Sequence, residues 1–259
     1  MARTVEDLAF LLSVIAGPSS RAPLSLEAPG SAFAPPLRTD AGLSGVRVAL
    51  STDLGGAIQV DHAVAEVVAA QAAVFTDAGA TVEDAHPVLH SADAAFRTLR
   101  AWLFQHRFRT LLEKRPDGFK QSLKDNILLG ADLSGEDVAM AFQQLTSIHD
   151  RMRAFFENYD VLALPVSQVP PFSAEEEYPS SINGQAQATY LDWMRSAYLI
   201  TVTGCPAISV PAGFTPEGWP VGIQLVGPVR GERRLLEIAH AFERATRVGE
   251  RRPELGASR

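Results

Sequence analysis

A single cysteine, Cys205, stands among the 259 residues, so no disulfide can form within the chain. Zinc sites are excluded almost as firmly, because there is neither a cysteine pair nor an H-E-x-x-H motif. The six histidines are scattered, and the two nearest, His86 and His90, have a proline between them. We therefore expect no metal and no cofactor.

Long hydrophobic runs are also missing, since no segment approaches the roughly 20 apolar residues of a membrane span. The apolar run 8–16 follows Glu6 and Asp7, where a signal peptide would carry basic residues. The formal net charge is −7, from 30 acidic and 23 basic residues, which argues against a broad nucleic-acid surface. These features favour a cytoplasmic protein without a membrane or nucleic-acid partner.

One segment could still bind nucleic acid, because arginines alternate with aromatic residues between Arg97 and Arg115. Trp102, Phe104 and Phe108 are the interleaved rings, a composition typical of stacking surfaces. The same pattern describes an amphipathic helix whose rings face a core and whose arginines are solvated or paired. The acidic net charge of the chain favours the helix.

No nucleophile with its supporting groups can be recognised. There is no G-x-S-x-G motif, and the adjacent serine pairs at 19–20 and 180–181 lie outside glycine-rich segments that could hold an oxyanion. Cys205 precedes Pro206 in an apolar run and is interpreted as a small buried hydrophobe. The glycines of "TDLGGA", 52–57, could approach a ligand, but they match no phosphate-binding motif and favour a turn.

Hydrophobic periodicity indicates an α/β fold. Thr4 is expected to cap a first helix, with Val5, Leu8, Leu12 and Ile15 on one face, before a long surface connection, 18–45. Further helices are expected from Asp61 to Gly79, through most of 91–158, over 189–202 and from Gly231 onward. Strands are expected at 46–50, 81–85, 160–165, 207–210 and 221–226. The first two strands flank a helix, which predicts a parallel βαβ unit.

The stretch "GCPAISVPAGFTPEGWPVGIQLVG", 204–227, is apolar and punctuated by glycine and proline. We expect two strands joined by a turn, with Val221, Ile223 and Leu225 on one face of the sheet. Gly222 would leave room on the opposite face. None of these residues is an obvious catalytic group, so the stretch is interpreted as a structural scaffold.

Several segments, in order, resemble the amidase signature family of serine hydrolases. "MARTVEDLAFLLSVIAG" is similar to the family's G-P-M-A-R-T-V-E-D-x-A-x-L-L helix, and "YDVLALPVSQVPP" to its Y/F-D-x-L-L-x-P strand and loop. The 204–227 stretch resembles the family's G-x-P-A-x-S-V-P hairpin, and "LLEIAHAFERAT" its closing helix. The resemblance spans Met1 to about Pro253.

The resemblance implies a mixed β-sheet layered between helices and the hydrolysis of a carboxamide by a Lys–Ser–Ser triad. In the family the lysine and both serines precede the "MARTVED" helix, with which this sequence begins. The only lysines here are Lys114, Lys120 and Lys124, and no serine motif surrounds them. No catalytic residue can therefore be carried over from the family.

The resemblance also implies a wall of the substrate cavity, because the stretch leading into G-x-P-A lines it in the family. The matching positions run from about Tyr198 to Cys205, and the candidate substrate-binding residues are Tyr198, Thr201, Thr203 and Cys205. The alternative is that they are plain core residues.

Two functional hypotheses remain open. In the first, 1–253 is the C-terminal portion of one truncated amidase domain, with 254–259 as a tail, and is inactive alone. In the second, the chain is a non-catalytic or split-amidase subunit that binds a signature-bearing partner or forms a homo-oligomer. Either way an incomplete sheet would leave an open strand edge and uncovered apolar faces, so we expect marginal stability in isolation. The substrate would be a small-molecule amide.

Overall fold

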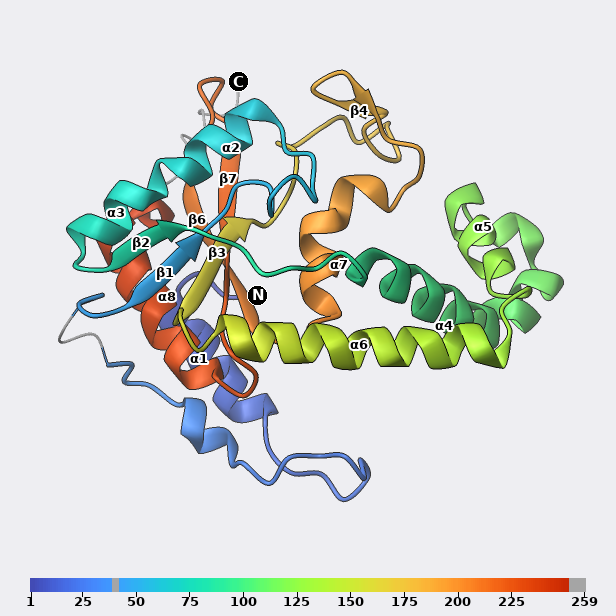
Figure 1. Ribbon diagram of the computed structural model, residues 1–259, viewed down its shortest axis with the longest axis horizontal. Coiled ribbons are helices and arrows are strands. Elements are labelled where there is room, and N and C mark those ends of the chain that lie inside the picture. Colours follow the sequence, from blue (N-terminus) through green and yellow to red (C-terminus); the bar gives the residue numbers. More distant parts are fainter. Residues whose placement is uncertain (39–41, 252–259) are drawn as a thin grey trace, which may run out of the picture.

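The computed structural model describes residues 1–38 and 42–251 (Figure 1). The predicted tail, 254–259, lies outside the described residues. The strands are β1 (Arg47–Leu50), β2 (Thr81–Asp84), β3 (Val161–Pro165), β4 (Ser181–Ile182), β5 (Gln185–Ala186), β6 (Ala207–Phe214) and β7 (Pro220–Val226). The α-helices are α1 (Val5–Ile15), α2 (His62–Ala69), α3 (Gln71–Asp77), α4 (Ala92–Lys114), α5 (Gln121–Leu129), α6 (Gly135–Phe155), α7 (Arg195–Thr201) and α8 (Glu232–Thr246).

Five strands form one mixed sheet in the order β2-β1-β3-β7-β6. The pairs of β1 with β2 and with β3 are parallel, which confirms the predicted βαβ unit, and β7 runs antiparallel to both β3 and β6. All five residues of the central strand β3 are buried, as expected for a strand covered on both faces. The sequence-based prediction of a mixed α/β fold is confirmed.

Helices cover both faces of this sheet. On one face a side chain at Gly213 would meet Val67 of α2, and Phe75 of α3 stacks on Phe242 of α8. On the other face Gln224 of β7 donates a hydrogen bond to the Ser196 carbonyl of α7. Alternation along β7 therefore points odd-numbered residues toward α2 and even-numbered residues toward α7.

Gly222 lies on the α7 face and marks a close approach. A Cβ atom there would lie 2.8 Å from Cγ1 of Val166 and 3.1 Å from Oγ of Ser209. The sequence-based expectation that Gly222 leaves room for a neighbour is therefore met, and the neighbour is the chain leaving β3.

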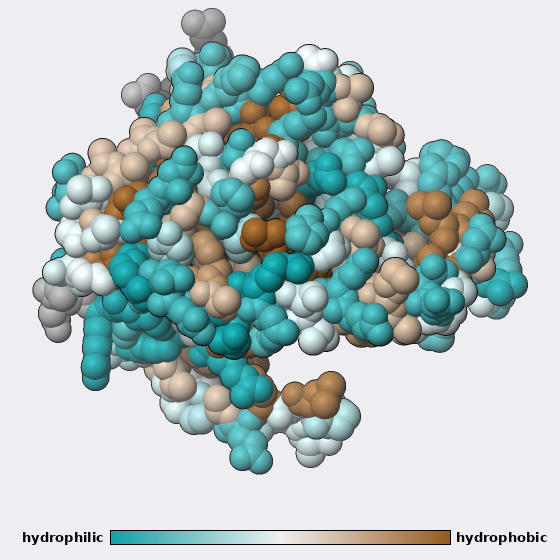
Figure 2. Space-filling view, viewed as in Figure 1, coloured by the Kyte–Doolittle hydropathy of each residue, from teal (hydrophilic) through white to brown (hydrophobic). Residues whose placement is uncertain are grey.

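Helices α4, α5 and α6 project from the sheet as a helical arm (Figure 1). Ser134 caps α6 through a capping box with Asp137. Figure 2 shows a hydrophobic patch over α5 at the end of this arm. The exposed large hydrophobic residues of the arm are Trp102, Leu103, Leu111, Leu128, Leu129, Met140 and Phe142. The arm therefore presents an exposed apolar face.

Helix α1 also differs from the expected pattern. Thr4 does cap it, accepting a hydrogen bond from the Asp7 amide at 3.0 Å, and Val5 is buried. Ile15, expected on the buried face, is 71% exposed, and it borders an open groove between α1 and the first turn of α8. Among the described residues, no helix is both long and apolar enough to span a membrane.

Two further boundaries differ from the prediction. The single helix expected from Asp61 to Gly79 is two helices that meet at Ala70, whose amide donates to two carbonyls, those of Glu66 and Val68. Nothing in the local sequence signals this break, since Ala70 keeps helical dihedral angles. The loop expected over 165–186 contains the short β4–β5 hairpin, turned by Asn183 and Gly184 at positive φ.

Candidate functional site

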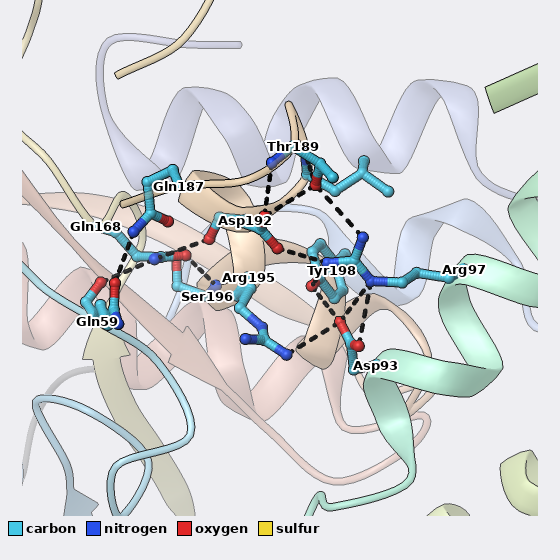
Figure 3. A network of polar contacts seen from close by, with 11 residues as sticks. Gln59, Asp93, Arg97, Gln168, Gln187, Thr189, Asp192, Arg195, Ser196 and Tyr198 are labelled. Carbon is cyan, nitrogen blue, oxygen red and sulfur yellow. Dashed lines mark hydrogen bonds and ion pairs between the residues drawn. The ribbon is translucent and has the colours of Figure 1, made fainter. Parts of the chain in front are cut away.

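The carboxyl ends of β1 and β3 lie next to each other at one end of the sheet, beside α7. In open sheets with parallel strands, ligands bind outside this end, where neighbouring strands connect in opposite directions. Here the chain leaves β1 through α2 and α3 and returns as β2, which pairs with one side of β1. Strand β3 pairs with the other side of β1. The segments that leave β1 and β3 border a network of polar side chains (Figure 3).

Gln168, which is fully buried, joins the three segments that border the site. Its Nε2 donates to the carbonyl oxygens of Gln59 at 2.8 Å and of Asp192 at 3.1 Å. Its Oε1 accepts from the Ser196 amide at 3.1 Å. One side chain thus ties the loop after β1 and the start of α7 to the loop after β3.

A cluster of charges lies next to Gln168 (Figure 3). Arg97 of α4 donates to Asp93 one turn earlier at 3.0 Å and reaches Asp192 at 2.6 Å. Arg195 contacts the same Asp93 carboxylate at 3.2 Å, and the Tyr198 hydroxyl donates to it as well. Two guanidinium groups and two carboxylates are therefore matched, and the cluster carries no net charge.

The contacts within the cluster lower the pKa values of the two carboxyl groups and so keep them ionised. Burial by itself raises the pKa of Asp93, but hydrogen bonds from Tyr198 and Arg97 outweigh it and leave that pKa below its usual value. The pKa of Asp192 is lowered in the same way: burial raises it, and hydrogen bonds donated mainly by Thr189 outweigh the effect of burial. Burial raises the pKa of Tyr198, and the bond to Asp93 raises it further. At neutral pH the tyrosine is a hydrogen-bond donor rather than a base.

A cavity of about 290 Å³ opens beside Gln168. The residues that line it come from the loop after β1, the loop after β3, the β5 region and the start of α7: Gly56, Ala57, Gln59, Gln168, Ala186, Gln187, Ala188, Asp192 and Arg195. Leu54, Gly55 and Gly56 are consecutive residues with positive φ. A left-handed Leu54 is strained, a state found most often where a loop serves a ligand. The "TDLGGA" segment, predicted to be a turn, is a turn that borders this cavity.

The four residues predicted to bind substrate have different surroundings, although the Cys205 amide donates to the Thr203 hydroxyl at 3.1 Å. Tyr198 is buried, stacks on Phe96 at 4.3 Å between centroids, and bonds to Asp93. Thr203 is buried and donates to the Ile200 carbonyl at 2.6 Å, whereas Thr201 is exposed. Cys205 lines a second cavity, of about 470 Å³, with Phe156 and Met152. That these residues form a substrate wall stays a prediction.

Cys205 is not set up as a nucleophile in this second cavity, because burial raises the pKa of its thiol. Among the described residues there is no group of three histidine, cysteine or carboxylate side chains that could hold a metal ion. The arginines in the predicted basic segment are partly used in pairing, as Arg97 and Arg109 illustrate.

Asp93→Asn should destabilise the protein by about 2 kcal/mol at pH 7, because two arginines and a tyrosine lose a charged partner. Because the pKa of Asp93 is lowered on folding, its contribution is complete above the unfolded value of about 3.9 and is lost as the pH falls toward the folded value. The variant should therefore lose less stability between pH 5 and acid than the wild type does, and Asp192, Asp137 and Glu217, whose pKa values are also lowered, contribute to the remaining slope.

Urea titrations across this pH range measure the difference. Asp132→Asn, at an exposed carboxylate between α5 and α6, is the matched control and should behave as the wild type. Equal pH dependence in Asp93→Asn and the wild type would show that Asp93 does not hold the cluster.

A fold of this topology, with a polar crevice at the ends of β1 and β3, matches one established class of protein. The family model described as Amidase matches residues 1–236, and the chain belongs to this family. The resemblance found in the sequence motifs is thereby confirmed. Fold and family together account for the 204–227 hairpin, which supplies β6 and β7.

Named relatives agree with this assignment. The chain is 30% identical over 255 residues to an acylamidase of Rhodococcus erythropolis, covering 97% of this chain and 52% of that protein. It is also 30% identical to one component of the glutamyl-tRNA(Gln) amidotransferase of Lactiplantibacillus plantarum, covering 100% of this chain and 56% of the relative. The chain thus spans about half the length of the curated relatives it matches.

Solved structures of amidases share this fold. A bacterial aryl acylamidase of the amidase signature family superposes with a TM-score of 0.81 at 25% identity, over 97% of this chain and 55% of that one. The 6-aminohexanoate cyclic dimer hydrolase, at 23% identity, shares the fold with a TM-score of 0.75 over 98% of this chain and 56% of that one.

Proposed function

We propose that these residues form the C-terminal portion of a carboxamide hydrolase, supplying substrate-cavity wall and scaffold but not the catalytic groups. The observation that carries the proposal is the polar cavity at the ends of β1 and β3, in a chain that belongs to the Amidase family. The Lys–Ser–Ser triad implied by the family resemblance has no counterpart in the 259 residues. A cytoplasmic location remains part of this proposal.

The triad would come from a signature-bearing segment, either continuous with these residues or a separate chain. We infer that this segment docks beside β6. In the described residues β6 pairs with β7 alone, so its other edge presents unpaired backbone groups. A trough of about 710 Å³ runs along it, bordered by residues 1–5, Leu8 and Arg251. A strand added at this edge would continue the sheet.

A fusion tests the proposal. The portion of the Rhodococcus erythropolis acylamidase that the chain does not cover, joined to these 259 residues by a flexible linker, should hydrolyse an anilide from a broad panel. The 259 residues alone should not, and neither should the fusion after its nucleophilic serine is changed to alanine. A well-folded fusion without turnover would contradict the proposal, as would turnover by the 259 residues that depends on one of their own serines.

A further inference from the structure

The β4–β5 hairpin is held by few contacts of its own. Each strand contributes two residues, and the pair forms a separate sheet at the periphery, away from the five-stranded sheet (Figure 1). Of the residues in the two strands and the turn, only Ile182 is buried. An isolated two-stranded hairpin is at best marginally stable, so this hairpin depends on its contacts with the rest of the protein.

Asn183 supplies two of these contacts from the turn of the hairpin. Its Nδ2 donates to the Val60 carbonyl at 2.8 Å, and its Oδ1 accepts from the His62 amide at 3.4 Å. Val60 and His62 belong to the segment that leads from β1 into α2. Directly after the hairpin, Gln187 lines the cavity beside Gln168. The Asn183 side chain therefore ties one border of this cavity to the segment after β1.

The residue that follows Asn183 makes this side chain chemically reactive. Asn183 is one of three asparagines in the sequence, and it is the only one followed by glycine. The nitrogen of a glycine can attack the side-chain carbonyl carbon of a preceding asparagine with little hindrance, because glycine has no side chain and an unrestricted backbone. A Cβ atom at Gly184 would meet nothing within 4 Å, and Asn183 is exposed, so both residues are open to solvent.

The closed turn delays this attack. Asn183 and Gly184 have φ values of 48° and 78°. In this left-handed conformation the Gly184 nitrogen is turned away from the Asn183 side chain, which is also held by its hydrogen bond to Val60. Ring closure therefore requires the hairpin to open locally, as marginal elements do under native conditions.

We propose that Asn183 is a site of spontaneous deamidation, and that the reaction permanently releases the β4–β5 hairpin from the segment after β1. When the turn opens, the Gly184 nitrogen loses its proton to hydroxide and forms a bond to Cγ of Asn183. The bond between Cγ and Nδ2 breaks, and the nitrogen takes a proton from water and leaves as ammonia. Water then opens the resulting succinimide to aspartate or isoaspartate.

Either product loses the contact that holds the hairpin. A carboxylate has no N–H group to donate to the Val60 carbonyl, so two acceptors would face each other. The modified turn cannot close as before, and one border of the cavity stays loose. The inference concerns a modification of this chain and holds whether or not the cavity serves a hydrolase.

Peptide mapping by mass spectrometry tests the reaction on the purified 259-residue chain, kept folded at mildly alkaline pH. Asn126 and Asn158, which precede Ile127 and Tyr159, are controls within the same sample. Asn183 should deamidate roughly tenfold faster than either control, because the residues after them carry side chains. It should deamidate more slowly than in a sample denatured in guanidinium chloride, since the closed turn protects it.

Two substitutions test the role of the closed hairpin. Ile182→Ala removes the buried anchor and should raise the deamidation rate of Asn183 toward that of the denatured sample. Asn183→Asp imitates the product, and peptides covering 181–187 should exchange their amide hydrogens several-fold faster than in the wild type. Asn158→Asp, which adds the same charge at an exposed position after α6, should exchange as the wild type does.

An intact Asn183 in the folded chain, at a time when the denatured sample is fully converted, would overturn the inference. Equal deamidation rates at Asn183 and the two control asparagines would do so as well. Wild-type protection of 181–187 in Asn183→Asp would show that Asn183 does not hold the hairpin, as would deamidation that is equally fast in the folded and the denatured chain.

Discussion

Phe242→Ala should remove about 3–5 kcal/mol of stability, the largest loss we expect from a single side chain. Phe242 on α8 and Phe75 on α3 are both fully buried, and their rings stack with centroids 4.7 Å apart. Replacing the Phe242 ring with a methyl group leaves a cavity between α3 and α8, the two helices that close one face of the sheet. The substitution also removes an aromatic pair worth about 0.5–1.5 kcal/mol.

Urea unfolding followed by circular dichroism measures this loss. Phe142→Ala on α6, where the residue is 52% exposed, is the matched control and should change stability by roughly 0.5 kcal/mol or less. If Phe242→Ala is already unfolded in buffer, Phe242→Leu keeps the comparison possible with a smaller loss. A Phe242→Ala protein as stable as the Phe142→Ala control would show that the α3–α8 contact does not support the core.

Gln168→Leu should cost roughly 3 kcal/mol and loosen the borders of the cavity. The substitution keeps the size of the side chain but leaves the Gln59 and Asp192 carbonyls and the Ser196 amide without their partner. Each buried polar group left unpaired costs on the order of 1–3 kcal/mol. Because the lost bonds tie three segments together, the effect should concentrate at the site.

Hydrogen exchange read by mass spectrometry separates this local effect from general instability. In Gln168→Leu, peptides covering 55–61 and 185–196 should exchange faster, while those of β7 and α8 change little under native conditions. Gln143→Leu, at an exposed position of α6, is the control. Unchanged protection at 55–61 would mean that Gln168 does not hold the loop after β1.

Much of the fold could be predicted because its signals are local. Apolar spacing indicated the buried face of α8, where Leu235, Ile238, Ala239 and Phe242 are all buried. The cap of α1 could be predicted as well, and Thr4 accepts from the Asp7 amide at 3.0 Å. Strand alternation and the Gly222 contact could be predicted in the same way, because each depends on a period of two residues.

The site could not be predicted in this way, since its residues come from four distant segments and share no spacing. Gln59, Asp93, Gln168 and Asp192 meet only because β1 and β3 end at the same edge and α4 packs against α7. Family resemblance directed attention to Tyr198, but the partner of its hydroxyl, Asp93, lies 105 residues away. The local signals available were a glutamine in a Pro-rich stretch, Gln168, and the glycines of "TDLGGA".

Labelling with a fluorophosphonate tests most directly whether these residues lack the nucleophile. Such probes phosphonylate the activated serine of serine hydrolases and spare unactivated hydroxyls, because only a serine with a base and an oxyanion site attacks them. The purified 259-residue chain should keep its unmodified mass of 27.9 kDa, as should a denatured sample treated in parallel. A stoichiometric adduct on the folded chain, mapped to one of its own serines and absent after denaturation, would contradict the assignment of catalysis to another segment.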